Sequence, residues 1–113
     1  MDFYLPITKN NGFRRVYSKG KAFISPVLVS YVMKTRGTDI YVGITTSKKI
    51  CNAVKRSRAR RVIREALRSF RGELKPGYNF VFVARSKTTS VKSTEVRRVM
   101  LFQLKKAGAL KSQ

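Results

Sequence analysis

Apolar residues recur along the chain at two spacings, one typical of helices and one typical of strands. Over residues 9–19 and 52–71 they gather on one face at about 100° per residue, which predicts two amphipathic helices. Thr8 is the expected N-cap of the first helix. A third helix is expected after a cap at Ser93 or Thr94, with apolar residues again on one face.

Other segments have the β-branched and aromatic residues that favour strands. Residues 23–33 predict one strand or a bent pair, with the bend at Ser25 and Pro26. Residues 35–39 read as a turn, and residues 40–46 as the next strand, so we expect an antiparallel hairpin between these two segments. Residues 78–84 form an apolar run interrupted only by Asn79, which predicts a strand covered on both faces.

The predicted elements follow one another as helix, two or three strands, helix, strand and helix. This order favours an α+β fold with one layer of sheet. Residues 1–113 contain no repeat, low-complexity tract or linker, and their number is typical of one domain. We therefore expect a single domain over residues 1–113.

Charge indicates what such a fold binds. The chain has 26 Lys and Arg residues against 5 Asp and Glu, a formal net charge of +21. Self-repulsion on this scale destabilises a compact chain unless a polyanion offsets it. A nucleic acid is the favoured partner, and an anionic membrane or an acidic protein are the alternatives.

The helix predicted over residues 52–71 concentrates this charge. Its arginines are Arg56, Arg58, Arg60, Arg61, Arg64, Arg68 and Arg71. Like charges four residues apart cost an isolated helix roughly 0.2–0.5 kcal/mol per pair, so an external anion is expected to offset them. The planar guanidinium suits phosphate, although a merely solvated face is an alternative. DNA would take such a helix in its major groove, whereas folded RNA would take it along its backbone.

A second basic element precedes this helix. Ser47, Lys48 and Lys49 lie where a predicted strand ends, and the helix N-terminus follows near Asn52. Backbone N–H groups at a helix N-terminus and two lysines together make a reasonable phosphate site.

Three aromatic residues admit two interpretations. Phe13 and Tyr17 project from one side of the first helix beside Arg14, and Tyr31 comes from a strand. These rings are either core residues or the lining of a groove in which single-stranded bases stack. Periodicity alone favours neither.

The chain has no evident catalytic chemistry of its own. The five carboxylates are scattered, without paired spacing, at Asp2, Asp39, Glu65, Glu73 and Glu95. There is no histidine, no glycine-rich phosphate loop, and no base beside the single cysteine, Cys51. One cysteine cannot form an intramolecular disulfide, which fits a reducing cytosol. The chain is predicted to bind rather than to cleave.

Residues 41–65 closely resemble the signature of the bacterial ribonuclease P protein family, and supporting similarity runs over roughly residues 5–106. The matching pieces are a strand with Gly43, then Ser47-Lys48-Lys49, Asn52-Ala53-Val54, Arg56-Ser57-Arg58, Arg60-Arg61 and Arg64-Glu65. Two residues depart from the pattern. Ser57 stands where the family usually has Asn, and Cys51 where it has Gly, so that turn either does not need a positive φ or is strained.

The resemblance implies an α-β-β-β-α-β-α fold with a left-handed crossover through the arginine-rich helix, and it divides the candidate site residues between two RNAs. The residues assigned to the catalytic RNA are Asn52, Arg56, Ser57, Arg58, Arg60, Arg61, Arg64 and Arg68. The residues assigned to the 5′ leader of precursor tRNA are Phe13, Arg14, Tyr17, Tyr31, Ser47, Lys48 and Lys49. The resemblance thus favours the groove interpretation of the three rings.

The same resemblance implies an auxiliary subunit of an endoribonuclease, with ribonuclease P RNA and precursor tRNA as partners. Cleavage would depend on Mg²⁺ held mainly by the RNA, with no metal bound tightly by this chain. We expect a cytoplasmic protein, monomeric when free, with one copy per RNA and no membrane association. A signal peptide and an apolar run of 18 residues are both missing from the sequence.

Two other classes of basic protein are less well matched. A ribosomal protein would more often carry long basic tails, whereas here the charge is concentrated on a central helix. A basic-helix DNA regulator would need a dimer seam or base-reading polar residues, and the sequence offers neither.

Overall fold

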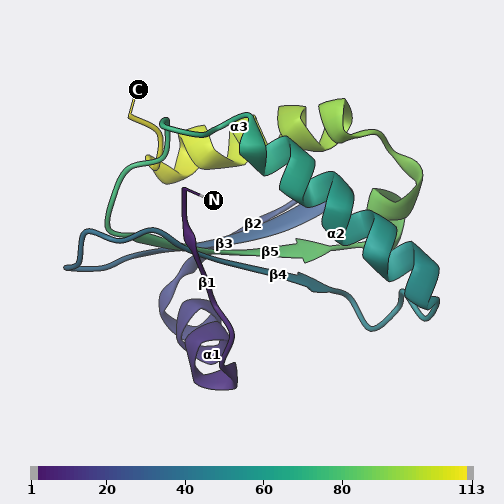
Figure 1. Ribbon diagram of the computed structural model, residues 1–113, viewed down its shortest axis with the longest axis horizontal. Helices are drawn as coiled ribbons and strands as arrows, with labels where there is room; N and C mark the ends of the chain where they lie inside the picture. Colours follow the sequence, from purple (N-terminus) through teal and green to yellow (C-terminus); the bar gives the residue numbers. More distant parts are fainter. Residues whose placement is uncertain (1–2, 112–113) are drawn as a thin grey trace.

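The computed structural model describes residues 3–111 and has an α+β architecture (Figure 1). Three α-helices and one short 3₁₀ helix accompany a five-stranded mixed sheet in this part of the chain. The elements in order are β1 (Leu5–Pro6), α1 (Asn10–Lys19), β2 (Lys21–Ile24), β3 (Leu28–Lys34), β4 (Tyr41–Thr46), α2 (Ala53–Arg68), β5 (Tyr78–Ala84), η1 (Ser86–Ser90) and α3 (Ser93–Ala107).

The sheet has the strand order β1-β4-β5-β3-β2. β3 is antiparallel to both of its neighbours, whereas β4 runs parallel to β5 and to β1. The predicted hairpin between residues 23–33 and 40–46 is therefore wrong, because β5 lies between β3 and β4. Phe80 of β5 is in register with Val32 on one side and Val42 on the other. A strand as apolar as residues 80–84 is stable only where it is covered, which is the centre of the sheet.

The loop after β3 is shaped by this insertion. Both the backbone N–H and the hydroxyl of Thr35 donate to the carbonyl of Gly77, at 2.7 and 2.9 Å. Gly77 has a φ of 81°, and a Cβ added there would approach the Gly37 carbonyl oxygen to 2.5 Å. The segment over residues 35–39 thus closes against the residues that lead into β5, rather than turning β3 onto β4.

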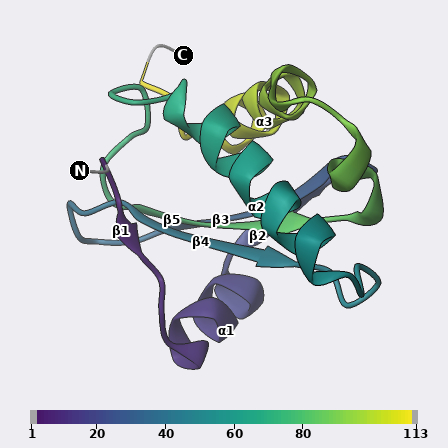
Figure 2. The same ribbon diagram turned by 45° about the vertical axis from the view of Figure 1, so that its right-hand side comes forward.

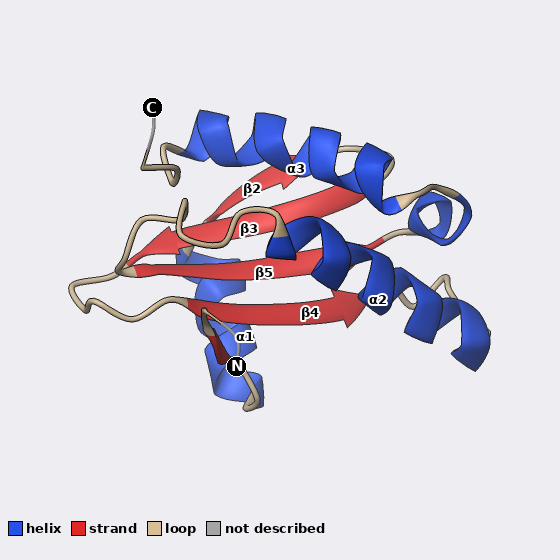
Figure 3. Ribbon diagram, turned by 45° about the horizontal axis from the view of Figure 1, so that its top comes forward, coloured by secondary structure: helices blue, strands red, loops and turns tan. Residues whose placement is uncertain are grey.

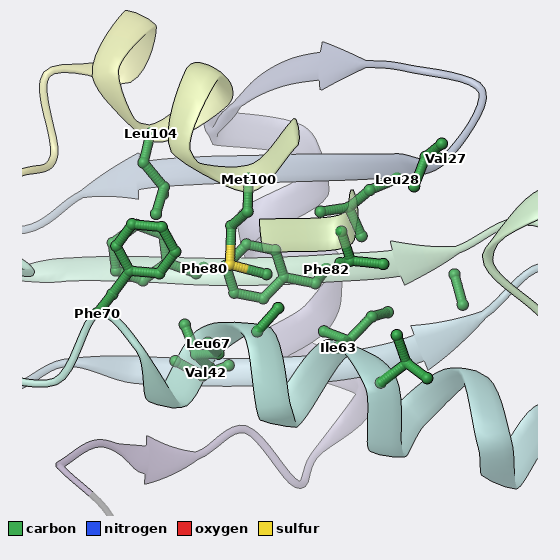
Figure 4. Packing of buried hydrophobic residues seen from close by; sticks show 14 of the residues in the cluster. Val27, Leu28, Val42, Ile63, Leu67, Phe70, Phe80, Phe82, Met100 and Leu104 are labelled. Atoms are coloured by element: carbon green, nitrogen blue, oxygen red, sulfur yellow. The ribbon is translucent and has the colours of Figure 1, made fainter. Parts of the chain in front are cut away.

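The main core lies between the sheet and two helices. α2 and α3 cover one face of the sheet, while α1 covers part of the other (Figures 1 and 2). Phe80 and Phe82 of β5 project into the main core, where Leu67 of α2 and Met100 of α3 surround them (Figure 4). Burial of these large side chains is the main favourable term in folding, and it fixes α2 firmly on the sheet.

A smaller cluster holds α1 on the opposite face. Val16 of α1 packs on Met33 and Val81, and all three side chains are buried. The ring of Phe13 lies directly over Gly43, where a Cβ would approach it to 2.5 Å. Only a residue without a side chain allows this approach, so Gly43 is required for the seating of α1.

Helix ends agree with the sequence in part. Asn52 caps α2, because its Oδ1 accepts from the N–H groups of Val54 and Lys55 at 2.8 and 3.2 Å. α2 ends three residues before the predicted 52–71 helix, since α-helical geometry stops at Arg68 and short turns follow. The predicted caps of the other helices are wrong: α1 and α3 start after Lys9 and Lys92, whose side chains form no capping hydrogen bond.

One buried polar residue joins α3 to the sheet. The Gln103 side chain accepts from the Ser30 hydroxyl at 2.6 Å and donates to the carbonyls of Phe23 and Leu28, both at 2.9 Å. Gln103 is 3% exposed, so water does not replace these bonds readily. It therefore fixes the distance between α3 and the β2–β3 edge.

We predict that Gln103→Leu lowers the free energy of unfolding by about 1–3 kcal/mol, because the partners of the amide would stay buried without it. Chemical denaturation measures the effect. Thr94→Val, at an exposed position of the same helix, is the control and should change stability by less than about 0.5 kcal/mol. Equal stability of the wild type and Gln103→Leu would show that the bonds contribute nothing.

Candidate nucleic-acid interface

The outer side of α2 carries arginines without protein partners. Arg61, Arg64 and Arg68 are exposed and Arg60 is half-buried. Within residues 3–111 none of these four guanidinium groups forms a hydrogen bond or an ion pair. Glu65, the only acid on α2, also has no ion pair there. The row is therefore held on a rigid helix with its donors open to solvent, which is the arrangement that phosphate contact requires.

Two other arginines of α2 are partly used inside the protein. Arg56 Nε donates to the carbonyl of Ile50, just before the helix. Arg58 donates from Nε to the carbonyl of Thr89 at 3.0 Å and from Nη2 to that of Val91 at 3.4 Å. Arg58 thus fastens α2 to the segment between η1 and α3. Of the sequence-predicted RNA contacts, these two have a structural role that the sequence did not indicate.

The helix geometry separates these arginines into two flanks. At about 100° per residue, Arg58 lies roughly 160° from Arg60, on the flank that faces η1. Arg60 and Arg64 lie on the flank turned away from η1. Arg61 and Arg68 lie between these two flanks, opposite the buried side of the helix.

Ser57 and Asn52 extend this surface toward the start of the helix. Both are exposed, and the Ser57 hydroxyl forms no hydrogen bond within the described part of the chain. The Asn52 oxygen serves the helix cap, which leaves its amide nitrogen as the group able to contact RNA. Cys51 has no positive φ, since the residues with positive φ in the structure are all glycines. The turn therefore does not need the glycine that the family usually has at this position.

The segment Ser47-Lys48-Lys49 forms a compact turn between β4 and α2. The N–H of Ser47 donates to the Ala84 carbonyl at 2.8 Å, and the N–H of Lys49 donates to the Ser47 hydroxyl at 3.3 Å. Both lysines are exposed. A cavity of about 210 Å³ beside this turn is lined by Lys49, Asn52 and Lys55, among others. It lies at the positive end of the α2 dipole, where an anion is favoured.

A further basic pocket adjoins the same turn. It has a volume of about 360 Å³ and combines Ser47 and Lys49 with Arg85 and Lys87. The sequence alone did not indicate Arg85, Lys87 or Lys55 as candidate site residues. Arg85 and Ser47 directly follow the parallel strands β5 and β4, and the carboxyl ends of parallel neighbours meet at one edge of the sheet. Arg85 and Ser47 could be placed together only once β4 and β5 were known to be parallel neighbours.

The aromatic residues gather on the opposite face of the sheet, beside α1. The rings of Tyr17 and Tyr31 meet edge to face with centroids 4.8 Å apart, and Phe13 lies 6.4 Å from Tyr17. Tyr17 is 39% exposed, whereas Phe13 is half-buried over Gly43. Phe13 thus fits both interpretations in part, because it packs on the sheet and also borders the exposed Tyr17.

Tyr17 keeps its proton at neutral pH. Burial, followed by the neighbouring Tyr31, raises the pKa of the Tyr17 phenol above its usual value of 10.0. A neutral phenol can donate a hydrogen bond to RNA and does not repel phosphate. Arg14 is exposed on the same side of α1 and has no hydrogen bond or ion pair among the described residues.

The sequence-predicted residues therefore form two surfaces and a basic turn that lies between them. The first surface is the outer side of α2, and the second is the aromatic face beside α1, which lies across the sheet (Figure 2). The Ser47-Lys48-Lys49 turn was assigned together with the rings, but its pockets join it to the α2 N-terminus and to Arg85. It lies at the edge of the sheet between the two surfaces.

Carboxylates do not assemble into a metal site in the described chain. No group of three or more His, Cys, Asp or Glu side chains suitable for a metal ion is found within residues 3–111. Asp2, one of the five acids, lies outside the described residues. The described helices also include none that is long and apolar enough to cross a bilayer.

Comparisons with known proteins agree on one family. The family model described as "Ribonuclease P" matches residues 4–108. The "Ribonuclease P protein component" of Clostridium beijerinckii is 40% identical over 109 residues, covering 90% of this chain and 87% of that protein. The protein of the same name from Clostridioides difficile is 44% identical over 80 residues, covering 70% of each.

Solved structures give the same result. The ribonuclease P protein of Staphylococcus aureus, at 25% identity, superposes with a TM-score of 0.81 and covers 98% of this chain and 100% of that one. The protein from Thermotoga maritima, at 26% identity, gives a TM-score of 0.71 over 83% and 89% of the two chains.

Two substitutions at Asn52 test whether its side chain caps α2. Asn52→Ala should lower the free energy of unfolding by about 1 kcal/mol, because the first turn of α2 loses its acceptor. Asn52→Asp should keep most of this stability, since a carboxylate also caps and suits the helix dipole. Thermal or chemical denaturation compares them. An aspartate variant as unstable as the alanine variant would contradict the cap.

Proposed function

The chain belongs to the ribonuclease P protein family, and on this basis we propose that it binds the catalytic RNA through α2 and the 5′ leader of precursor tRNA through the aromatic face. It is a protein subunit of ribonuclease P, the endoribonuclease ribonucleoprotein that processes the 5′ ends of precursor tRNAs.

The proposed binding of the catalytic RNA rests on the open arginine row of α2. Arg60, Arg61, Arg64 and Arg68 have no protein partner among residues 3–111, and the chain has a net charge of +21. Their mutual repulsion is relieved when phosphates lie beside them. A helix cannot enter the deep major groove of an RNA duplex readily, so α2 would lie along the backbone of folded RNA. Arg56, Arg58, Ser57 and Asn52 would support or extend this contact.

The proposed binding of the 5′ leader rests on the aromatic face, where Tyr17 is exposed and Tyr31 is half-buried. Tyr17 and Tyr31 present an edge-to-face pair beside the half-buried Phe13, with Arg14 close by in sequence. Aromatic rings with an adjacent cation suit single-stranded RNA, because every base has a face on which to stack. The leader is the unpaired part of the precursor, so this surface would distinguish precursor from mature tRNA. The Ser47-Lys48-Lys49 turn would hold backbone phosphate between the two surfaces.

Hydrolysis would remain with the RNA and its Mg²⁺ ions. The proposal is in keeping with the scattered carboxylates of residues 3–111. The contribution of the chain is then to position the substrate, and its cations would lower the repulsion between two RNAs that approach each other.

We also propose a left-handed crossover from β4 through α2 to β5, against the usual right-handed preference. β4 and β5 are parallel neighbours. In Figure 3 α2 lies in front of the sheet, β4 points to the right, and β5 lies above β4. This arrangement supports the left-handed path.

The remaining proposals concern the whole chain. One family model spans residues 4–108, which supports a single domain. A highly charged chain repels its own copies, which supports a monomer when free and one copy per RNA. We propose that it acts in the cytoplasm, where precursor tRNAs are made in bacteria.

Reconstitution tests the proposed function directly. Adding the chain to a bacterial ribonuclease P RNA at low Mg²⁺ should increase cleavage of a leader-bearing precursor, because the protein offsets repulsion that Mg²⁺ otherwise screens. Initial rates with and without the protein give the result. Unchanged cleavage at every Mg²⁺ concentration would refute the assignment.

Charge reversal tests the α2 surface. Arg60→Glu combined with Arg64→Glu should weaken binding to the catalytic RNA and reduce the slope of log affinity against log salt by about one to two. Lys34→Glu combined with Arg36→Glu, at exposed positions around the end of β3, makes the same change in net charge and is the control. An equal loss of slope in both double variants would show that only net charge matters.

A further inference from the structure

A groove lies at the β2 edge of the sheet, where α3 runs along β2 (Figure 3). Its volume is about 690 Å³, and residues from both faces of β2 line it. Ala22 and Ile24 come from the face that carries α1, whereas Phe23 comes from the face under α3. The groove therefore wraps around the edge strand and connects the two faces.

Two large apolar side chains in this groove are exposed to an unusual degree. Phe102 of α3 is 61% exposed and Ile24 is 72% exposed. Gln103, next to Phe102, is buried and bonded to the sheet, so the backbone that presents the ring is fixed. An exposed ring on a fixed backbone is a feature of contact surfaces rather than of cores.

Cations accompany the rings. Lys106 lines the groove, and its Nζ lies 4.9 Å from the centroid of Phe102. Lys21 lines an adjoining pocket that shares Phe23 and Lys106 with the groove, and its Nζ lies 5.7 Å from the centroid of Phe23. Arg98 also lines the groove, but it pairs with Glu95, which offsets its charge. Stacking rings with unpaired lysines have the chemistry that holds single-stranded nucleic acid.

The groove is continuous with the aromatic face. Ala22 is in register with Tyr31, and Ile24 with Val29, so all four side chains lie on the same face of the sheet. From this face the groove is reached at Ile24, which lines it together with Phe102. A strand of RNA seated on Tyr17 and Tyr31 could therefore continue over Ile24 to the groove.

We propose that this groove binds the 5′-distal part of the precursor leader. A base stacks on Phe102, while Lys21 and Lys106 contact the adjoining phosphates. The inference rests on the proposed function and extends it, because it adds a second stacking position beyond the tyrosine pair. A second copy of the chain is disfavoured as the occupant, since two chains of net charge +21 repel each other.

The experiment uses the reconstituted holoenzyme and precursors whose leaders are lengthened one nucleotide at a time. With the wild-type chain, affinity should rise in two steps, the second when the leader reaches Phe102. Phe102→Ala should abolish the second step, a loss of about fivefold or more for long leaders, and spare short leaders and mature tRNA. Phe102→Tyr, which keeps the stacking face, should restore the step.

Further variants separate this inference from the proposed function. Tyr17→Ala should lower the affinity for short and long leaders alike, and no such loss would refute the proposed leader path itself. If Tyr17→Ala behaves as expected but Phe102→Ala leaves every leader unchanged, only the groove proposal is overturned. Equal loss in Phe102→Ala for long leaders and mature tRNA would also overturn it. So would self-association, or binding of an acidic peptide, that depends on Phe102 and excludes RNA.

Discussion

Repulsion among the arginines of α2 is the constraint on which the rest of the structure depends. Arg60, Arg64 and Arg68 follow one another at intervals of four residues, with no carboxylate partner among residues 3–111. An isolated helix with this row would be weakened. The apolar side of α2 offsets that cost by burying Ile63 and Leu67 against β5. A stable core thus holds cations in a row that only an external polyanion can neutralise.

The sheet separates this row from a different kind of surface. α2 and α3 bury one face, while α1 covers only part of the other. On that face Tyr17 is exposed and Tyr31 is half-buried. One face therefore offers guanidinium groups for a folded RNA backbone, and the other offers rings for unpaired bases. The basic turn at Ser47 and Lys49 lies between them. This placement suits a protein that contacts two RNAs at once.

Local patterns predicted the local structure well. The 3.6-residue spacing located α2, whose N-terminus lies near Asn52 as expected. The apolar run of β5 correctly indicated a covered strand. The predicted hairpin was wrong, because the sequence does not say that β5 enters between β3 and β4. The hydrogen bonds of Arg58 to the carbonyls of Thr89 and Val91 depend on the same long-range packing, since these acceptors lie more than 30 residues away in the sequence. The candidate surfaces could thus be named, but their relative placement could not.

A structure of this chain bound to a bacterial ribonuclease P RNA and a leader-bearing precursor, determined by electron cryomicroscopy, tests the central claim most directly. The account predicts phosphates of the catalytic RNA beside Arg60 and Arg64, and unpaired leader nucleotides on the opposite face beside Tyr17. Finding the outer side of α2 exposed to solvent in that complex, or both RNAs on one face of the sheet, would contradict it.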